Sequence, residues 1–122
     1  MMADVEKILK VCGLGTYLHI GCGNGAIVFE LLKRTADAYG MDSHEENVKI
    51  NIERAPSRFC LGSLSNFPFD QGQIDTIIIG PEIFTFKPEH FSIVMESIRK
   101  LTNRHLVLYF PDGFLQNIPP ER

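Results

Sequence analysis

The sequence predicts an α/β fold, in which a parallel sheet of about five strands has helices on both faces. Apolar segments typical of strands alternate along the chain with segments whose apolar residues recur at helical spacing. The segment from Ile74 to Ile79 is an almost unbroken apolar run, which is typical of a strand covered on both faces. Strands that alternate with helices in this way form a parallel sheet between two helical layers.

Composition places the chain among small globular domains. With 122 residues it can build one core but not two, and its net charge of −3 is no electrostatic footprint for nucleic acid or an anionic membrane. The three cysteines have no Cys-x-x-Cys spacing, which favours reduced thiols and a cytoplasmic protein. Because no apolar run reaches membrane-spanning length and the N-terminus is charged, we expect neither a membrane span nor a signal peptide.

The first elements are predicted from local patterns. Apolar residues at helical spacing predict a helix over 4–12, and Gly13 stands where such a helix ends. A strand over 16–20 and a helix over 25–33 enclose a glycine-rich turn, and a short second strand follows at 37–41.

A capping box predicts where the next helix begins. Ser43 and Glu46 have the spacing at which a serine caps a helix and the glutamate reaches back to it. A helix that begins there places Val48, Ile52 and Ala55 inward.

The second half continues the alternation. A short third strand is expected at 58–61, a fourth at 74–79 and a fifth at 105–110. Pro88 at a first helical position predicts a helix between the last two of these strands. The inward side of that helix consists of Phe91, Val94, Met95, Ile98 and Leu101. The tail over 111–122 carries turn residues and prolines.

Four loops are predicted to meet at one edge of the sheet. In parallel sheets, ligands bind beyond the carboxyl ends of the strands, at the point where the strand order reverses. The loops that end there contain the glycines at 21, 23 and 25, then Asp42, then Gly62 with Ser63, and finally Gly80. Missing Cβ atoms allow a ligand to approach the backbone, and a helix start offers free N–H groups. A single glycine would satisfy a tight turn, so three of them favour a ligand.

Asp42 has two interpretations, a helix cap or a ligand-binding carboxylate. Because Ser43 and Glu46 already supply the cap, we favour the ligand. Asn24, in contrast, is better explained as the cap of the helix that follows it.

Four segments in this order carry a family resemblance. They are His-Ile-Gly-Cys-Gly-Asn-Gly at 19–25, Gly-Met-Asp-Ser at 40–43, Leu-Ser-Asn-Phe-Pro-Phe-Asp at 64–70 and Ile-Asp-Thr-Ile-Ile-Ile at 74–79. Over residues 16 to about 110 the chain resembles class I S-adenosylmethionine-dependent methyltransferases of the methyltransferase type 11-like kind. The resemblance implies a single Rossmann-like domain over 1–122 with its core at 16–110, and S-adenosylmethionine as the cofactor.

The resemblance also implies roles for individual residues. The glycines would pass under the amino acid moiety and the ribose of the cofactor, and Asp42 would accept hydrogen bonds from the ribose hydroxyls. The cofactor-binding set it implies is His19, Gly21, Cys22, Gly23, Gly25, Asp42, Ser43, Gly62, Ser63, Leu64 and Gly80. It identifies no catalytic residue, and the histidines have no companions at metal-ligand spacing.

Three departures from the family pattern matter. His19 stands where the family usually has an acidic residue near the cofactor's amino group, and Ser63 stands where an Asp often meets the adenine. The family's sheet also has two strands after the fifth, so the chain is C-terminally short. Residues 105–110 would then form an apolar edge, to be covered by a homodimer, a partner subunit or the proline-rich tail.

Three functions therefore stay open. The first is a methyltransferase that acts on an unidentified small molecule or protein. The second is a non-catalytic, methyltransferase-like interaction domain, favoured by His19 and the short C-terminus. The third is a nicotinamide-binding fragment, because Gly21-x-Gly23-x-x-Ala26 loosely fits that fingerprint. Cofactor binding separates the first from the second.

Overall fold

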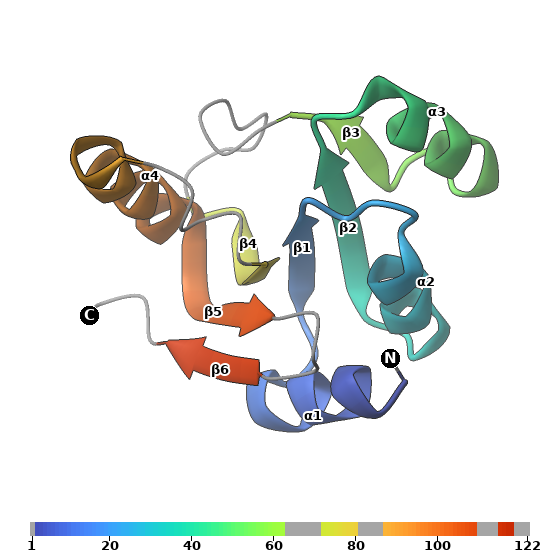
Figure 1. Cartoon of the computed structure of the whole chain (residues 1–122). Coiled ribbons are helices and arrows are strands. Elements are labelled where there is room, and N and C mark those ends of the chain that lie inside the picture. The colour runs from blue at the N-terminus through green and yellow to red at the C-terminus, as the bar shows by residue number, and fades with distance from the viewer. Residues whose placement is uncertain (1, 63–71, 81–86, 110–114, 119–122) are drawn as a thin grey trace.

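The structure, a computed structural model, describes residues 2–62, 72–80, 87–109 and 115–118. Within these ranges a six-stranded sheet has the order β3-β2-β1-β4-β5-β6 (Figure 1). The helices are α1 (Met2–Cys12), α2 (Ala26–Lys33), α3 (Glu45–Arg54) and α4 (Pro88–Leu101). The strands are β1 (Thr16–Ile20), β2 (Asp37–Asp42), β3 (Phe59–Leu61), β4 (Ile74–Ile79), β5 (Thr102–Tyr109) and β6 (Leu115–Ile118). The first five strands are parallel, which confirms the predicted fold class.

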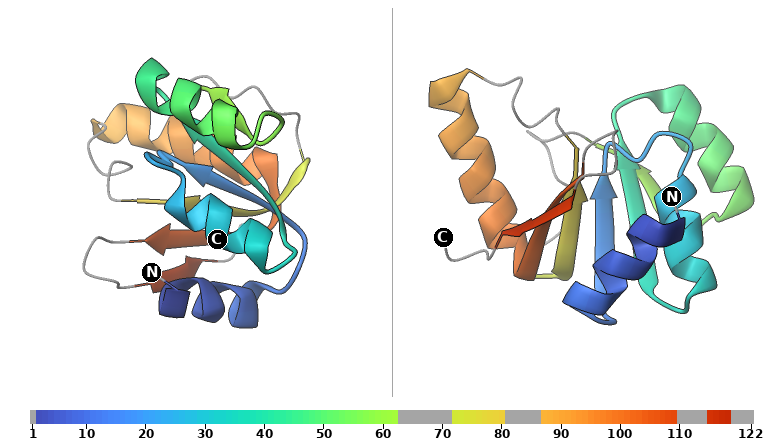
Figure 2. Two further views of the ribbon diagram at one scale, coloured as in Figure 1. Left: turned by 90° about the vertical axis from the view of Figure 1, so that its right-hand side faces the viewer. Right: turned by 60° about the horizontal axis from the view of Figure 1, so that its bottom comes forward.

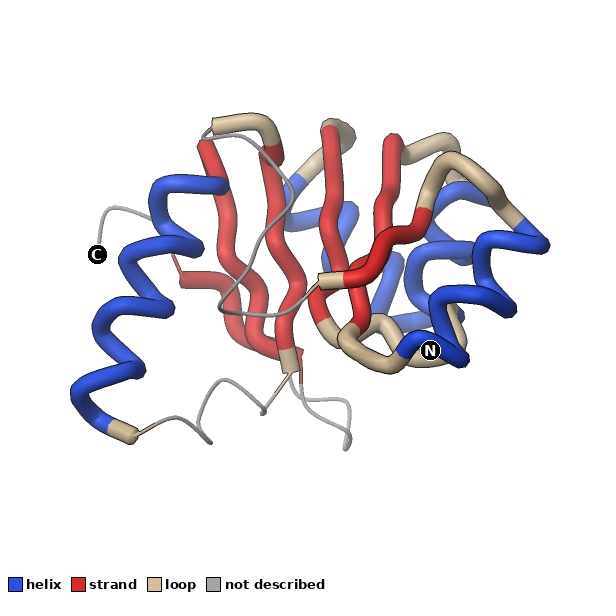
Figure 3. Tube along the Cα trace, turned by 90° about the horizontal axis from the view of Figure 1, so that it is seen from above, coloured by secondary structure: helices blue, strands red, loops and turns tan. Residues whose placement is uncertain are grey.

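The sheet lies between two helical layers. Helices α1, α2 and α3 cover one face, and α4 covers the other (Figures 2 and 3). Alternate residues of β1 enter different cores, because successive strand side chains point to opposite faces. Tyr17 packs with α1 and α2, whereas Leu18 packs with α4. The predicted inward residues Val94, Ile98 and Leu101 of α4 are buried, as expected.

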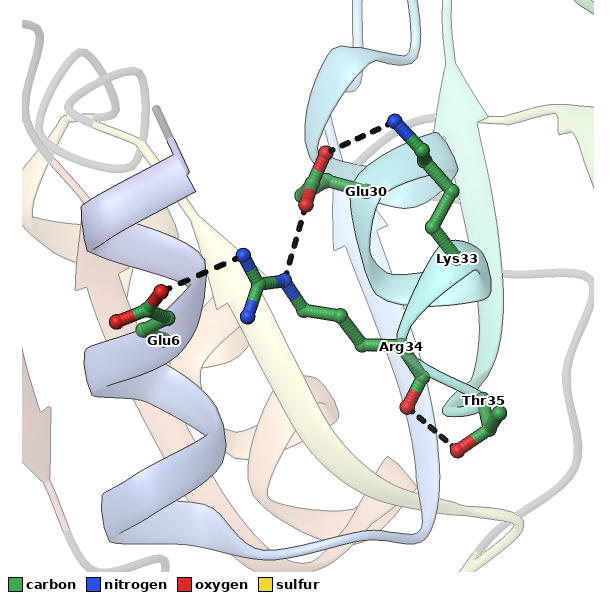
Figure 4. A network of polar contacts seen from close by, with 5 residues as sticks. All are labelled: Glu6, Glu30, Lys33, Arg34 and Thr35. Atoms are coloured by element: carbon green, nitrogen blue, oxygen red, sulfur yellow. Dashed lines mark hydrogen bonds and ion pairs between the residues drawn. The ribbon is translucent and has the colours of Figure 1, made fainter.

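A polar network joins α1 to α2 at the rim of the first layer (Figure 4). Arg34 Nε donates to Glu30 Oε2 at 2.9 Å, and its guanidinium lies 3.6 Å from Glu6 of α1. Lys33 reaches the same glutamate at 3.9 Å. Ion pairs at such partly exposed positions contribute little stability, so the apolar contacts beneath them hold the two helices together.

The inward face of α3 differs from the prediction. Val48 is buried as expected, but Ile52 is 37 % exposed and Asn51 is buried in its place. An asparagine is ordinarily assigned to the surface, and this one is buried because its amide donates a hydrogen bond to the loop after β1.

The predicted capping box is also wrong. The cap of α3 is His44, which makes no side-chain capping bond, and the helix does not use Ser43 for this purpose. The N–H of His44 instead donates to the carboxylate of Asp42. The acceptor is the last residue of β2, so the start of α3 is tied to that strand and not to the serine hydroxyl.

The edge of β5 is covered within the chain. Residues 115–118, predicted to be part of an irregular tail, form β6 and pair antiparallel with Leu106 to Tyr109. Of the three coverings expected for this edge, the structure therefore contains the tail, and the edge does not by itself call for a second subunit. β5 also begins earlier than predicted, at Thr102.

Candidate cofactor-binding site

The ends of four parallel strands bring the predicted loops together. Ile20 lies between Met41 and Ile79, and Asp42 lies beside Leu61. The residues that follow, Gly21, Gly62 and Gly80, therefore lie with Asp42 along one edge of the sheet, to which the arrowheads of β1 and β2 point in Figure 1. The strand order reverses between β1 and β4 at this edge, where α/β proteins bind ligands.

Backbone hydrogen bonds tie these loops to one another. The N–H groups of Gly21 and Cys22 both donate to the carbonyl of Met41, at 2.8 and 3.1 Å. The N–H of Gly62 donates to the carbonyl of Asp42 at 3.1 Å. The loops after β1, β2 and β3 therefore form one connected backbone surface.

The three glycines of the loop after β1 do different work. Gly21, Gly23 and Gly25 all have positive φ, at 76°, 55° and 79°, so the turn itself requires all three. The interpretation that one glycine would satisfy the turn was wrong. A Cβ on Gly25 would lie 2.9 Å from Phe29, so this glycine also serves packing. A Cβ on Gly23 would meet no described atom within 4 Å, so Gly23, unlike Gly25, borders open space.

Asp42 is the buried anion of the site. Its Oδ2 accepts from the N–H of Gly23 at 2.7 Å, and its Oδ1 accepts from the N–H of His44 at 2.8 Å. Burial alone would raise the pKa of Asp42, but these bonds outweigh burial and lower it, so the carboxylate is ionised at neutral pH. Asp42 is thus not left free, as the capping argument assumed. It joins the glycine loop to the start of α3.

His44 is a residue of the site that the predicted set does not include. Its side chain is 78 % exposed, yet its Nδ1 lies 3.0 Å from Asp42 Oδ1. The available signal was its position two residues after an aspartate, where an Asx turn brings backbone and side chain to the carboxylate. A protonated His44 would form an ion pair with Asp42.

His19 is a buried neutral group beside the site. It lies on β1 between Gly40 and Ile78 and is only 8 % exposed. Burial lowers its pKa to about 4 even though the charge of Asp42 acts in the opposite direction, so the imidazole is neutral at pH 7. Its Nδ1 is buried without a hydrogen-bond partner among the described residues.

The remaining predicted residues fall into three groups. The Cys22 side chain belongs to the core, where its Sγ packs against Gly40 and burial raises its pKa to about 12. Ser43 is exposed at the carboxyl edge, and Gly62 and Gly80 are half-buried there. Ser63 and Leu64 lie outside the described residues.

Asn51 is a second residue that sequence reasoning missed. Its Nδ2 donates to the carbonyl of Gly23 at 2.8 Å, and its exposed fraction is 1 %. The prediction that Asn24 caps α2 is wrong, because the cap is Gly25 and makes no side-chain capping bond. Asn24 Oδ1 does accept from the N–H of Ala26, the first residue of the helix, at 3.0 Å. Asn51 is thus the described side chain of α3 that bonds the glycine loop, next to the bond that Asp42 of β2 makes to it.

Other kinds of site are not seen in the described ranges. No helix there is long and apolar enough to cross a membrane. The same ranges contain no group of three or more His, Cys, Asp or Glu side chains that could hold a metal ion.

The glycine–aspartate edge lies where the strand order of this α/β fold reverses, and comparison with known proteins identifies the family. Residues 18–105 match a family model described as a methyltransferase domain, and the chain therefore belongs to that family. A search of curated proteins finds no match.

Solved structures share the fold at low sequence identity. The PH0226 protein from Pyrococcus horikoshii is 24 % identical with a TM-score of 0.75, over 89 % of this chain and 56 % of that one. A putative S-adenosylmethionine-dependent methyltransferase from Methanococcus maripaludis is 21 % identical with a TM-score of 0.74, over 92 % and 56 %. Magnesium protoporphyrin IX methyltransferase from Synechocystis, solved with bound S-adenosylhomocysteine, is 21 % identical with a TM-score of 0.69, over 88 % and 54 %. The chain thus spans a little over half the length of these structures.

Proposed function

We propose that this chain binds S-adenosylmethionine at the carboxyl edge of its sheet and transfers the methyl group to a small molecule or a protein. The observation that carries the proposal is Asp42, an ionised carboxylate held beside the open face of Gly23 at the reversal of strand order. Membership of the methyltransferase family supports the choice of cofactor. The thiols of Cys12, Cys22 and Cys60 are free, as expected if the protein is cytoplasmic.

The residues at this edge fit such a cofactor. A carboxylate has about four acceptor sites. Three acceptor sites of Asp42 are taken, by the N–H of Gly23, the N–H of His44 and the His44 ring. One acceptor site therefore remains for a ribose hydroxyl. A neutral His19 presents an unpartnered nitrogen close to the loop and can accept one hydrogen bond from an ammonium group. We assign further contacts to Ser43, Gly62 and Gly80, which lie along the same edge.

The protein has little covalent chemistry to perform in this reaction. When bound, S-adenosylmethionine supplies an already activated methyl group. Gly23 and Asp42 then have to hold the ligand in one orientation, and positioning of this kind accounts for much of the acceleration in such displacements. No catalytic residue has to be assumed unless the acceptor must lose a proton.

A non-catalytic interaction domain is the second candidate, and His19 favours it. A buried imidazole with a pKa of about 4 carries no charge to attract the cofactor ammonium, whereas an acid at this position would. One similar structure is a complex between the Haloferax volcanii Trm112 methyltransferase activator and a putative methyltransferase, at 18 % identity. By analogy we propose that a partner subunit completes the function of this chain.

Calorimetric titration distinguishes these functions. Purified protein is titrated with S-adenosylmethionine and S-adenosylhomocysteine, with NAD as the control. We expect micromolar binding of the first two and no binding of NAD. Failure of all three ligands to bind would overturn the proposal and favour the interaction domain, and binding of NAD alone would favour the nicotinamide site.

A further inference from the structure

We infer that Asn51 is a positioning residue that, together with Asp42, holds the glycine loop in its ligand-ready shape. This inference rests on the proposed function, because the shape matters for the cofactor that Gly23 and Asp42 would bind. Asn51 itself is buried in α3 and acts through Gly23.

Gly23 is held by two side chains from separate elements. Its N–H donates to Asp42 Oδ2 of β2 at 2.7 Å, and its carbonyl accepts from Asn51 Nδ2 of α3 at 2.8 Å. These two groups belong to successive peptide units, so the two bonds together fix both φ and ψ of Gly23. The Asn51 bond therefore also determines how the Gly23 N–H meets Asp42.

No described side chain packs against the face of Gly23 on which a Cβ would lie. Glycine has the largest backbone freedom of any residue, and the φ of Gly23 is +55°. No described atom would lie within 4 Å of a Cβ placed on it, in contrast to Gly25, whose neighbours are the rings of Phe29 and Phe59. Hydrogen bonds must order Gly23 instead. A loop that is ordered before the ligand arrives loses less conformational entropy on binding, which raises affinity.

The carbonyl oxygen of the Asn51 side chain indicates that this residue does not increase the stability of the fold. Its Oδ1 is buried without a hydrogen-bond partner among the described residues, and an unsatisfied buried acceptor opposes folding. Its neighbours on the inward side are Val48 of α3 and Ala55, the residue that caps the helix, and beside these apolar residues a leucine of similar size would be satisfied. The donor to Gly23 is the property that a leucine would lack.

The test compares Asn51→Leu with wild-type protein and with the control Asn47→Leu. Asn47 is a half-buried asparagine one turn earlier on α3, and it supplies none of the loop hydrogen bonds described above. Three quantities are measured: stability in urea, amide hydrogen exchange at Gly23 and Gly25 without ligand, and the Kd of S-adenosylhomocysteine. The Gly25 N–H bonds to the Cys22 carbonyl at 2.9 Å and so reports closure of the turn around Gly23.

We expect Asn51→Leu to be at least as stable as wild type, to exchange these two amides about tenfold faster and to bind S-adenosylhomocysteine about tenfold more weakly. The control should match wild type in exchange and in Kd. If Asn51→Leu fails to fold, Asn51→Ala removes the same donor without adding bulk, and the same exchange and affinity changes are expected.

Two results would overturn the inference. The first is amide exchange at Gly23 and Gly25 that is unchanged in the folded variant. The second is that wild-type protein binds S-adenosylhomocysteine and the variant binds it with the same Kd. If wild-type protein binds no cofactor, the proposed function fails, but exchange at Gly23 and Gly25 still decides whether Asn51 positions the loop. The two failures are thus separable.

Discussion

Two aspartate–glycine pairs lie at opposite ends of β1, and they make the same kind of contact. At the amino end, Asp75 Oδ2 accepts from the N–H of Thr16 at 2.9 Å, next to Gly15. At the carboxyl end, Asp42 Oδ2 accepts from the N–H of Gly23 at 2.7 Å. Their hydrogen bonds alone would not reveal which end is functional.

The space beside each glycine separates the two pairs. A Cβ on Gly15 would lie 2.6 Å from Asp75 Oδ2, whereas a Cβ on Gly23 would meet no described atom within 4 Å. The first pair is a closed contact between the start of β1 and β4, which gives Asp75 a structural role. The second borders open space, where a ligand can approach. Unfilled space beside a buried anion is thus the better sign of a site.

The largest expected effect is on the free energy of unfolding, when Gly15 and Gly23 are each replaced by alanine. We expect Gly15→Ala to lower the free energy of unfolding by about 3–5 kcal/mol, because strained backbone at φ +146° adds to the clash with Asp75. Gly23→Ala should cost only about 1–2 kcal/mol, the price of left-handed backbone without a clash. Urea unfolding followed by circular dichroism measures both. Equal losses would contradict the division into a closed pair and an open pair.

A second prediction uses acid to probe the carboxyl end, where His19 is buried near Asp42. The folded pKa of about 4 lies below the ordinary 6.5, so the unfolded chain binds a proton first as the pH falls. The stability contributed by neutral His19 is complete above pH 6.5 and declines by about 3 kcal/mol toward pH 4. Unfolding of wild type and His19→Gln across this range measures the difference. A pH-independent difference would show that the imidazole is not buried in its neutral form.

The third prediction separates the aspartates by ligand affinity. Asp42→Asn should weaken S-adenosylhomocysteine binding by about 1.5–3 kcal/mol, the scale of a hydrogen bond to a charged group. Asp75→Asn makes the same chemical change at the other end of β1 and should leave the Kd unchanged. Calorimetry on both variants tests the contrast. If both variants changed the Kd equally, Asp42 would affect binding only by stabilising the fold and not by contacting the ligand.

Local patterns were sufficient for most of the fold. The strand at Ile74–Ile79 has the predicted bounds and the helix α4 begins at the predicted Pro88, because burial on both faces and an N-terminal proline leave strong marks in sequence. Gly21, Asp42 and Gly62 were placed at one edge by counting parallel strands alone. That prediction needed only strand order and direction.

The site itself was less predictable. Ser43 and Glu46 have the spacing of a capping box, yet α3 has no side-chain cap, and its cap residue His44 instead donates its N–H to Asp42. Spacing shows which bonds are available and not which of them form.

The sequence by itself determined the order of the elements, the turn built on glycines and the acid at the end of β2, because each depends on neighbours a few residues away. Only the tertiary structure decided that Asn51 turns inward, that His19 is neutral and that residues 115–118 cover β5. Each of these depends on groups distant in sequence: the amide of Asn51 meets a loop 28 residues away, and the pKa of His19 follows from burial in the completed core. Contacts and burial of this kind exist only after the chain has folded.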